Sequence, residues 1–171
     1  FTLLGHPMGG MPVRRALAAA RARARKLVAL TPVPASGVPF DDAGWALFSG
    51  AAANPDNRHA IIDYTTGNRL AKTWVRRMVD YSLAHAAQPA FAAYLRAWAR
   101  TDFSGDVAGM PLPVKVIVGE HDPALTPTMM QTTFLATYPD CELEVMANAG
   151  HYPMHETPIA LATSIENFLR R

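Results

Sequence analysis

The sequence predicts an α/β protein with a mostly parallel sheet of about four strands, helices on both faces and a helical insertion. Short apolar runs of strand length alternate with longer stretches of helical periodicity. This alternation is typical of parallel sheets, because each return to a parallel strand needs a crossover, usually a helix. A block in the middle of the chain shows helical periodicity alone, and this block is the predicted insertion.

The first part of the chain is expected to form a strand, a tight turn, a helix and a second strand. Residues 1–4 are an apolar run that ends at Gly5, as in a buried parallel strand. The stretch 11–26 is rich in alanine and arginine, which favour helix. The apolar run 27–31 predicts the second strand, and prolines mark the loop that follows it.

Residues 41–100 contain no strand-like run. Apolar residues recur there at helical spacing, and Asn-Pro, Thr-Gly and Gln-Pro pairs interrupt the pattern. We therefore expect several short helices inserted into a core made of residues 1–40 and 101–171.

Strand signals return after the insertion. The apolar run 114–118 predicts a strand, and Thr126, followed by proline, is an N-cap for a helix expected to reach about Tyr138. Residues 142–146 alternate polar and apolar, which predicts a strand exposed on one face. Thr157 caps a last helix that continues to the end of the chain.

Composition bounds the function classes. Half of the 171 residues are apolar and the net charge is +2, as in an ordinary globular domain. No apolar run is long enough to cross a bilayer, so we expect no membrane partner. The arginine-rich stretch 14–26 is expected to be a solvated helix face, so we expect no nucleic-acid partner. A single cysteine, Cys141, favours a reducing, cytoplasmic location.

Three short motifs follow strands. Residues 5–10 read Gly-His-Pro-Met-Gly-Gly, and the glycines permit a tight strand-to-helix turn. Asp122 follows the strand 114–118, and His151 follows the strand 142–146. The carboxyl ends of parallel strands meet at one edge of a sheet, so these residues are expected to converge. A histidine held by a carboxylate can act as a base. Asp122 is the first candidate for this carboxylate, and Glu120 is the second.

This arrangement resembles the α/β-hydrolase superfamily, in particular its esterases and lipases. The family's nucleophile turn commonly reads Gly-His-Ser-Met-Gly-Gly, and five of the six positions match here. Nucleophile position, acid and histidine also follow the family's chain order. The resemblance covers essentially the whole chain as the C-terminal half of that fold, with 41–100 as its cap. It departs at Pro7, where the family has its serine nucleophile.

The resemblance implies a parent activity, the hydrolysis of an ester or related acyl bond in a small apolar substrate, without metal or cofactor. Asp122 would be the acid, His151 the base and Pro7 the nucleophile position, and the backbone N–H of Met8 would be an oxyanion donor. Hydrolysis is expected to be impaired, because proline offers no nucleophile. Its fixed φ near −65° also conflicts with the positive φ of that turn.

Substrate contacts are expected from His6 in the turn and from Trp45 and Trp74 in the cap, although cap aromatics also suit the core of the cap. A metal at His151 and His155 is disfavoured by the proline between them. Cys141 lies at the wrong end of its strand, and nothing activates the nearby hydroxyl of Ser36.

Two further functions stay open. One is an inactive relative that binds a ligand or partner without turnover, and the other is proton abstraction by the His151–Asp122 pair without a serine. We also expect the chain to be a piece of a longer protein. Its strand at 1–4 would then present an apolar edge that a second copy or the missing N-terminal half would cover.

Overall fold

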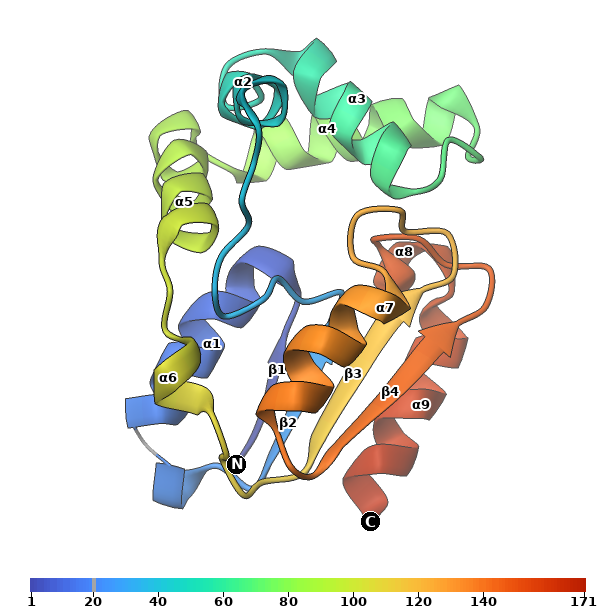
Figure 1. Cartoon of the computed structure of the whole chain (residues 1–171). Helices are drawn as coiled ribbons and strands as arrows, with labels where there is room; N and C mark the ends of the chain where they lie inside the picture. The colour runs from blue at the N-terminus through green and yellow to red at the C-terminus, as the bar shows by residue number, and fades with distance from the viewer. Residues whose placement is uncertain (20) are drawn as a thin grey trace.

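The computed structural model describes residues 1–19 and 21–171, and of Met8 and Arg21 it describes the backbone alone. The chain forms a four-stranded sheet with helices on both sides (Figure 1). In chain order the elements are β1 (Thr2–Gly5), α1 (Pro7–Ala19), the 3₁₀ turn η1 (Arg21–Arg23), β2 (Lys26–Leu30), α2 (Asp42–Gly50), α3 (Pro55–Thr65), α4 (Lys72–His85), α5 (Gln88–Arg100), α6 (Ser104–Val107), β3 (Val114–Gly119), α7 (Pro127–Met130), the π-helical η2 (Gln131–Leu135), β4 (Cys141–Met146), α8 (Pro153–Glu156) and α9 (Pro158–Arg170).

The sheet is parallel throughout and its strand order follows the chain, β1-β2-β3-β4. The register places Leu4 beside Val28, and Val28 beside Lys115. Every residue of β3 is buried, as expected for a central parallel strand. The predicted fold class, about four parallel strands flanked by helices, is confirmed.

Alternate residues of the central strands feed two cores. Leu27, Ala29 and Val116 join one core with α1 and η2, which also contains Phe134. Val28 and its alternating neighbours join the other core, which α9 covers. Helices α1 and α7 therefore lie on one face of the sheet and α9 on the other (Figure 1).

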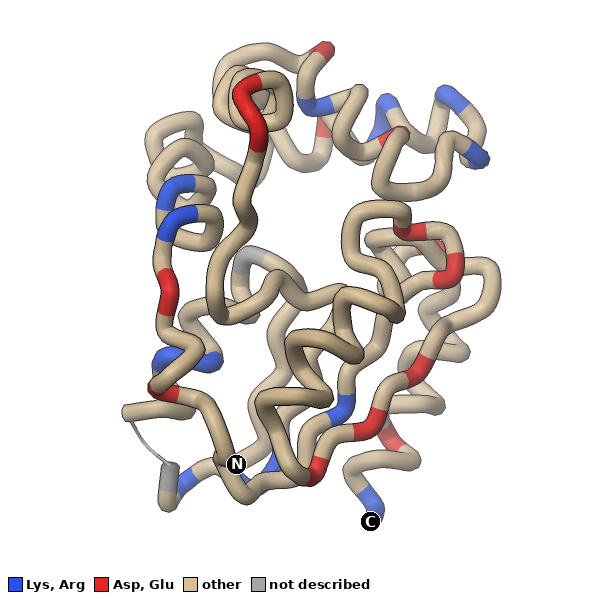
Figure 2. Tube along the Cα trace, in the orientation of Figure 1, with Lys and Arg blue, Asp and Glu red and all other residues tan. Residues whose placement is uncertain are grey.

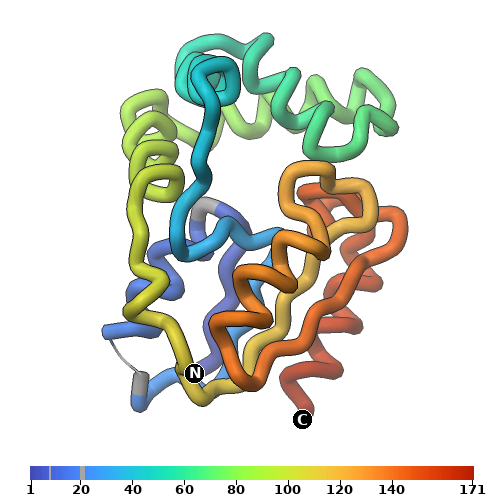
Figure 3. The backbone as a smooth tube through the Cα atoms, viewed as in Figure 1, coloured from blue at the N-terminus to red at the C-terminus, as the bar shows by residue number. Residues whose placement is uncertain are grey.

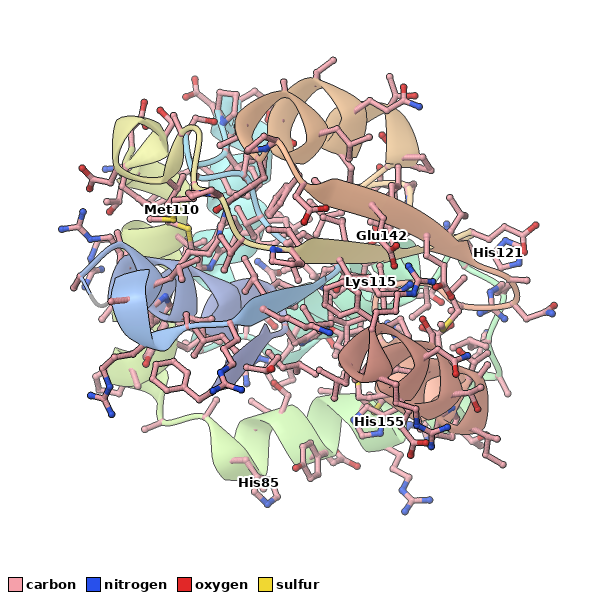
Figure 4. All side chains as sticks on the ribbon, turned by 90° about the horizontal axis from the view of Figure 1, so that it is seen from below. His85, Met110, Lys115, His121, Glu142 and His155 are labelled. Atoms are coloured by element: carbon pink, nitrogen blue, oxygen red, sulfur yellow. The ribbon has the colours of Figure 1, made fainter. Side chains whose placement is uncertain are left out.

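One charged residue is buried in the sheet. Lys115 of β3 is on the α9 face, where its Nζ lies 2.8 Å from Glu142 and 2.7 Å from Glu144 of β4. Figure 2 shows acidic residues along β4, and Figure 4 shows Lys115 beside Glu142. The two carboxylates compensate the charge of the lysine, which satisfies the requirement that buried charges be paired.

Helices α2 to α5 occupy residues 42–100, the region predicted as a helical insertion. Helices α2, α3 and α4 lie beyond the carboxyl ends of the strands, opposite the two chain termini (Figure 3). Ile62, Val75 and Val79 form a small core between α3 and α4. No described helix is long and apolar enough to cross a membrane. That this region is a cap with the expected boundaries stays a prediction.

The predicted helix 11–26 was misplaced. Helix α1 begins at Pro7 and ends at Ala19, so it includes Gly9 and Gly10 of the motif. Proline suits the first position of a helix, because its missing N–H would have no helical partner there. The first helical hydrogen bond runs from Gly10 N to His6 O, at 2.9 Å.

Candidate active site

The turn between β1 and α1 is tight but unstrained at Pro7. A Cβ on Gly5 would lie 2.6 Å from the Cα of Gly10, so any larger residue at position 5 would separate strand from helix. Pro7 is buried, and no described residue from 5 to 10 has a positive φ. Met8 is the second residue of α1; its side chain lies outside the described residues, and its role as an oxyanion donor stays a prediction.

Asp122 lies in the loop just after β3 and is buried. Its Oδ1 accepts hydrogen bonds from the backbone N–H groups of Ala124 and Leu125, at 2.9 and 3.2 Å. These bonds fix the position of the carboxylate on the loop. The other oxygen, Oδ2, is left to face His151.

His151 is paired with Asp122. The Nδ1–H of His151 donates to Oδ2 of Asp122 at 2.6 Å, and the two side chains are 15% and 0% exposed. The bond leaves Nε2 as the bare ring nitrogen of the neutral imidazole. An acceptor nitrogen held in a fixed orientation by a buried carboxylate can take a proton from a reacting group.

The backbone of His151 is held by three segments. Its N–H donates to the carbonyl of Thr65 at the end of α3, at 3.1 Å. Its carbonyl accepts from Nε2–H of His6 at 2.8 Å and from the hydroxyl of Thr31 at 3.2 Å. The turn after β1, the loop after β2 and the helical insertion thus all fix the position of this histidine.

Glu156 also holds the loop of His151. Its Oε2 accepts from Gly150 N at 2.8 Å, and its Oε1 accepts from Tyr152 N at 2.9 Å. The side chain is 2% exposed and forms an ion pair with Arg69. Sequence reasoning missed this residue, because a glutamate in a short helix gives no local signal of what it contacts.

His6 is neutral at physiological pH. Burial, followed by the nearby imidazole of His151, lowers the pKa of His6 to about 3. The neutral ring carries one N–H hydrogen. This hydrogen is on Nε2 and is donated to the carbonyl of His151. The two imidazole rings meet edge to face with centroids 5.3 Å apart.

A cavity of about 550 Å³ adjoins both Pro7 and His151. His6 lines this cavity, whereas Trp45 and Trp74 lie outside its lining. That His6 contacts a substrate stays a prediction. Trp45 packs on Phe40 and stacks with Arg100, and Trp74 lines a separate cavity. Their periodicity placed them on helices but could not tell which face of the insertion meets the strand ends.

The cavity is mostly apolar. Its lining residues are Leu4, Gly5, His6, Pro7, Gly9, Val13, Phe48, Arg58, Ile61, Ile62, Ser82, Phe91, His151 and Tyr152. Sequence reasoning also missed Arg58, although it had a signal: it lies three and four residues before the apolar Ile61 and Ile62, and so on their side of the helix.

The other candidates of the sequence do not join this site. Glu120 accepts from Asn148 N at 3.0 Å, and Ser36 lines a different cavity. Burial raises the pKa of the Cys141 thiol to about 12, which leaves it unreactive. His155 is exposed. Among the described residues, no group of three or more His, Cys, Asp or Glu side chains is placed to hold a metal ion.

Comparison with known proteins agrees with this architecture. The model of a family described as "Alpha/beta hydrolase family" matches residues 1–163. A search of curated proteins found no match.

Several solved structures share the fold. A bromoperoxidase from Bacillus anthracis is 19% identical with a TM-score of 0.78, and the alignment covers 99% of this chain and 67% of that one. A carboxylesterase from Bacillus subtilis, CesB, is 20% identical with a TM-score of 0.75, and the coverages are 98% and 59%. An esterase from Exiguobacterium antarcticum is 14% identical with a TM-score of 0.83, and the coverages are 99% and 66%. This chain thus spans about three-fifths to two-thirds of the length of these proteins.

Proposed function

Because the chain belongs to the alpha/beta hydrolase family, we propose that its site derives from an esterase site in which Asp122 is the acid, His151 the base and Pro7 the nucleophile position. The parent activity is hydrolysis of an ester or related acyl bond in a small, largely apolar molecule. The mostly apolar lining of the cavity supports this substrate class.

The 2.6 Å contact between His151 Nδ1 and Asp122 Oδ2 carries the proposal. In the parent reaction a hydroxyl at position 7 attacks the acyl carbon while its proton passes to Nε2 of His151. The imidazolium, stabilised by Asp122, gives that proton to the leaving alcohol. Water then attacks the acyl-enzyme by the same route and releases the acid.

In the present chain this sequence cannot begin at position 7. Proline has no hydroxyl, and it begins α1 without the positive φ that presents the family's nucleophile. A backbone donor in the oxyanion hole stabilises the transition state by about 3 kcal/mol. The backbone N–H of Met8 alone, without a nucleophile at position 7, would therefore give only weak hydrolysis.

The test is the hydrolysis of p-nitrophenyl butyrate by the unsubstituted chain, by Pro7→Ser and by Pro7→Ser combined with His151→Ala. We expect a burst of p-nitrophenol from Pro7→Ser alone, followed by slow turnover. Equal release by the two serine-bearing variants would contradict the proposal, because activity would not depend on the histidine.

The second candidate function is ligand binding without turnover, and Pro7 is the observation that favours it. A formed cavity with no nucleophile at position 7 suits ligand binding. It predicts saturable binding of small esters by both the unsubstituted chain and Pro7→Ser, with no burst from either. The same p-nitrophenyl assay, run beside calorimetric titration of methyl butyrate, distinguishes the two functions.

A further inference from the structure

The cavity beside His151 contains one permanent charge. Among its described lining residues Arg58 is the only lysine, arginine, aspartate or glutamate, and most of the others are apolar. Arg58 lies on α3, and only 2% of its surface is exposed. A guanidinium buried in an apolar wall has lost most of its contact with water, so its charge calls for a counter-charge.

The described residues provide no such counter-charge in an ion pair. No aspartate or glutamate in the described part of the chain forms an ion pair with Arg58. Its Cζ lies 4.3 Å from the centre of the Phe91 ring, which compensates the charge only in part. Burial lowers the pKa of Arg58, but an arginine stays cationic at physiological pH.

One edge of the guanidinium has a structural task. Nε and Nη2 donate to the carbonyl of Ala51 at 3.0 and 2.7 Å, and Nη2 also reaches Ala52 at 3.4 Å. These bonds close the C-terminal end of α2, where a cation is favoured. They account for the Nε–Nη2 edge and leave Nη1 unexplained.

The other edge of the guanidinium contacts Ser82, which lines the cavity together with Arg58. Nη1 donates one hydrogen to the hydroxyl of Ser82 at 3.1 Å. Nη1 carries a second hydrogen, and the hydroxyl of Ser82 carries one hydrogen. Neither of these two hydrogens has an acceptor among the described residues. Since Arg58 and Ser82 both line the cavity, a charged N–H and a hydroxyl stand side by side at its wall. This pair suits the oxygens of a carboxylate.

We propose that Arg58 and Ser82 form a subsite for a carboxylate, so that the cavity takes small esters that carry a carboxylate away from the ester bond. The inference rests on the proposed function, because it assigns a substrate class to the site of His151. The apolar lining would contact the carbon chain between the two groups.

Two ligands of similar size test the subsite on the unsubstituted chain. Monomethyl glutarate has an ester and a carboxylate, and methyl butyrate has the ester alone. We expect calorimetric titration at pH 7 to give a Kd about tenfold or more lower for monomethyl glutarate, as one charge-assisted hydrogen bond provides. We also expect that ligand to shift the NMR resonance of Arg58 Nε–H. Equal affinity for the two ligands would overturn the proposal, whatever the variants do.

Variants separate the subsite from the rest of the protein. Arg58→Gln should remove the preference, so that the two ligands bind with similar Kd, and Ser82→Ala should reduce the preference several-fold. Arg76→Gln, on the exposed side of α4, is the matched control and should keep it. A preference that survives in folded Arg58→Gln would overturn the assignment.

His151→Ala separates the carboxylate subsite from the proposed hydrolysis. It should keep the carboxylate preference, because the histidine does not contact the subsite pair in the described structure. If the preference is present but Pro7→Ser gives no burst, the subsite stands and the proposed hydrolysis fails.

Discussion

The carboxylate of Glu156 brackets His151, because it accepts hydrogen bonds from the backbone N–H groups of the residues on either side, Gly150 and Tyr152. A buried acid thereby fixes the loop that carries the base of the proposed site. Arg69 forms an ion pair with the same carboxylate and compensates its charge. The geometry between His151 and Asp122 thus depends on a glutamate that is not itself among the described residues lining the cavity.

Glu156→Gln should destabilise the protein by about 1–3 kcal/mol. The amide keeps one acceptor oxygen but turns an N–H toward a backbone N–H, and the ion pair with Arg69 is lost. Urea denaturation measures the change. Glu166→Gln is the control, because its exposed pair with Arg170 should contribute less than about 0.5 kcal/mol. Similar losses from the two variants would contradict a holding role for Glu156.

Asp122→Asn, made together with Pro7→Ser, should lower kcat for p-nitrophenyl butyrate by about 10³–10⁴-fold. The amide keeps the shape but cannot hold the imidazole in the required tautomer or stabilise its charge. Glu120→Gln in the same background should change kcat little, because that carboxylate accepts from Asn148 instead. A larger effect at Glu120 would reverse the assignment of the acid.

The half-buried His6 makes stability depend on pH. Its pKa is about 3 in the folded chain, mainly because of burial, and near 6.5 when unfolded. Below pH 6.5 the unfolded chain therefore takes up a proton that the folded chain refuses. The stabilising contribution is complete above pH 6.5 and is lost as pH falls toward 3, at up to about 1.4 kcal/mol per pH unit.

The variant His6→Asn should reduce the loss of unfolding free energy as pH falls from 6.5 to 4. Urea denaturation at each pH measures this free energy. The exposed His85→Asn is the control and should leave that decline unchanged. A decline that is equally steep in His6→Asn would show that other groups cause it.

The sequence predicts the strands and the pairing of acid and base for one reason: both depend on local pattern and on parallel topology. The short apolar run 114–118 predicts a buried strand, and residues after parallel strands meet at one edge, so Asp122 and His151 converge. The sequence prediction of the start of α1 is wrong. Gly9 and Gly10 suggest a turn, but Pro7 already begins the helix.

Contacts between distant segments lie beyond such patterns. Trp45 and Arg58 both lie in the helical insertion, yet only Arg58 lines the cavity of His151. Which of them does so depends on how α2, α3 and α5 pack, and helical periodicity fixes only the apolar side of each helix. The bracket that Glu156 forms depends likewise on the path of the chain from Gly150 into α8.

Gly150→Ala should destabilise the protein by about 1–3 kcal/mol, the usual cost of overpacking. Its Cβ would lie 2.7 Å from the Cα of Thr66 and 2.9 Å from the carbonyl of Thr65, the acceptor of the His151 N–H. Urea denaturation would detect the loss of stability, and amide exchange at His151 would detect the disturbance of its hydrogen bond to Thr65. Gly105→Ala, where a Cβ meets nothing within 4 Å, should instead stabilise the protein by about 0.5–1 kcal/mol.

The free edge of β1 should make this chain self-associate. Among the described residues β1 pairs with β2 alone, and Leu4 on this strand is 48% exposed. An apolar strand with unpaired backbone groups is a template for a strand of a second copy. Thr2→Lys should weaken association several-fold in analytical ultracentrifugation, because lysine opposes pairing between edges. Thr163→Lys, exposed on α9, should not. A monodisperse monomer with fast amide exchange at residues 2–4 in the unsubstituted chain would contradict this prediction.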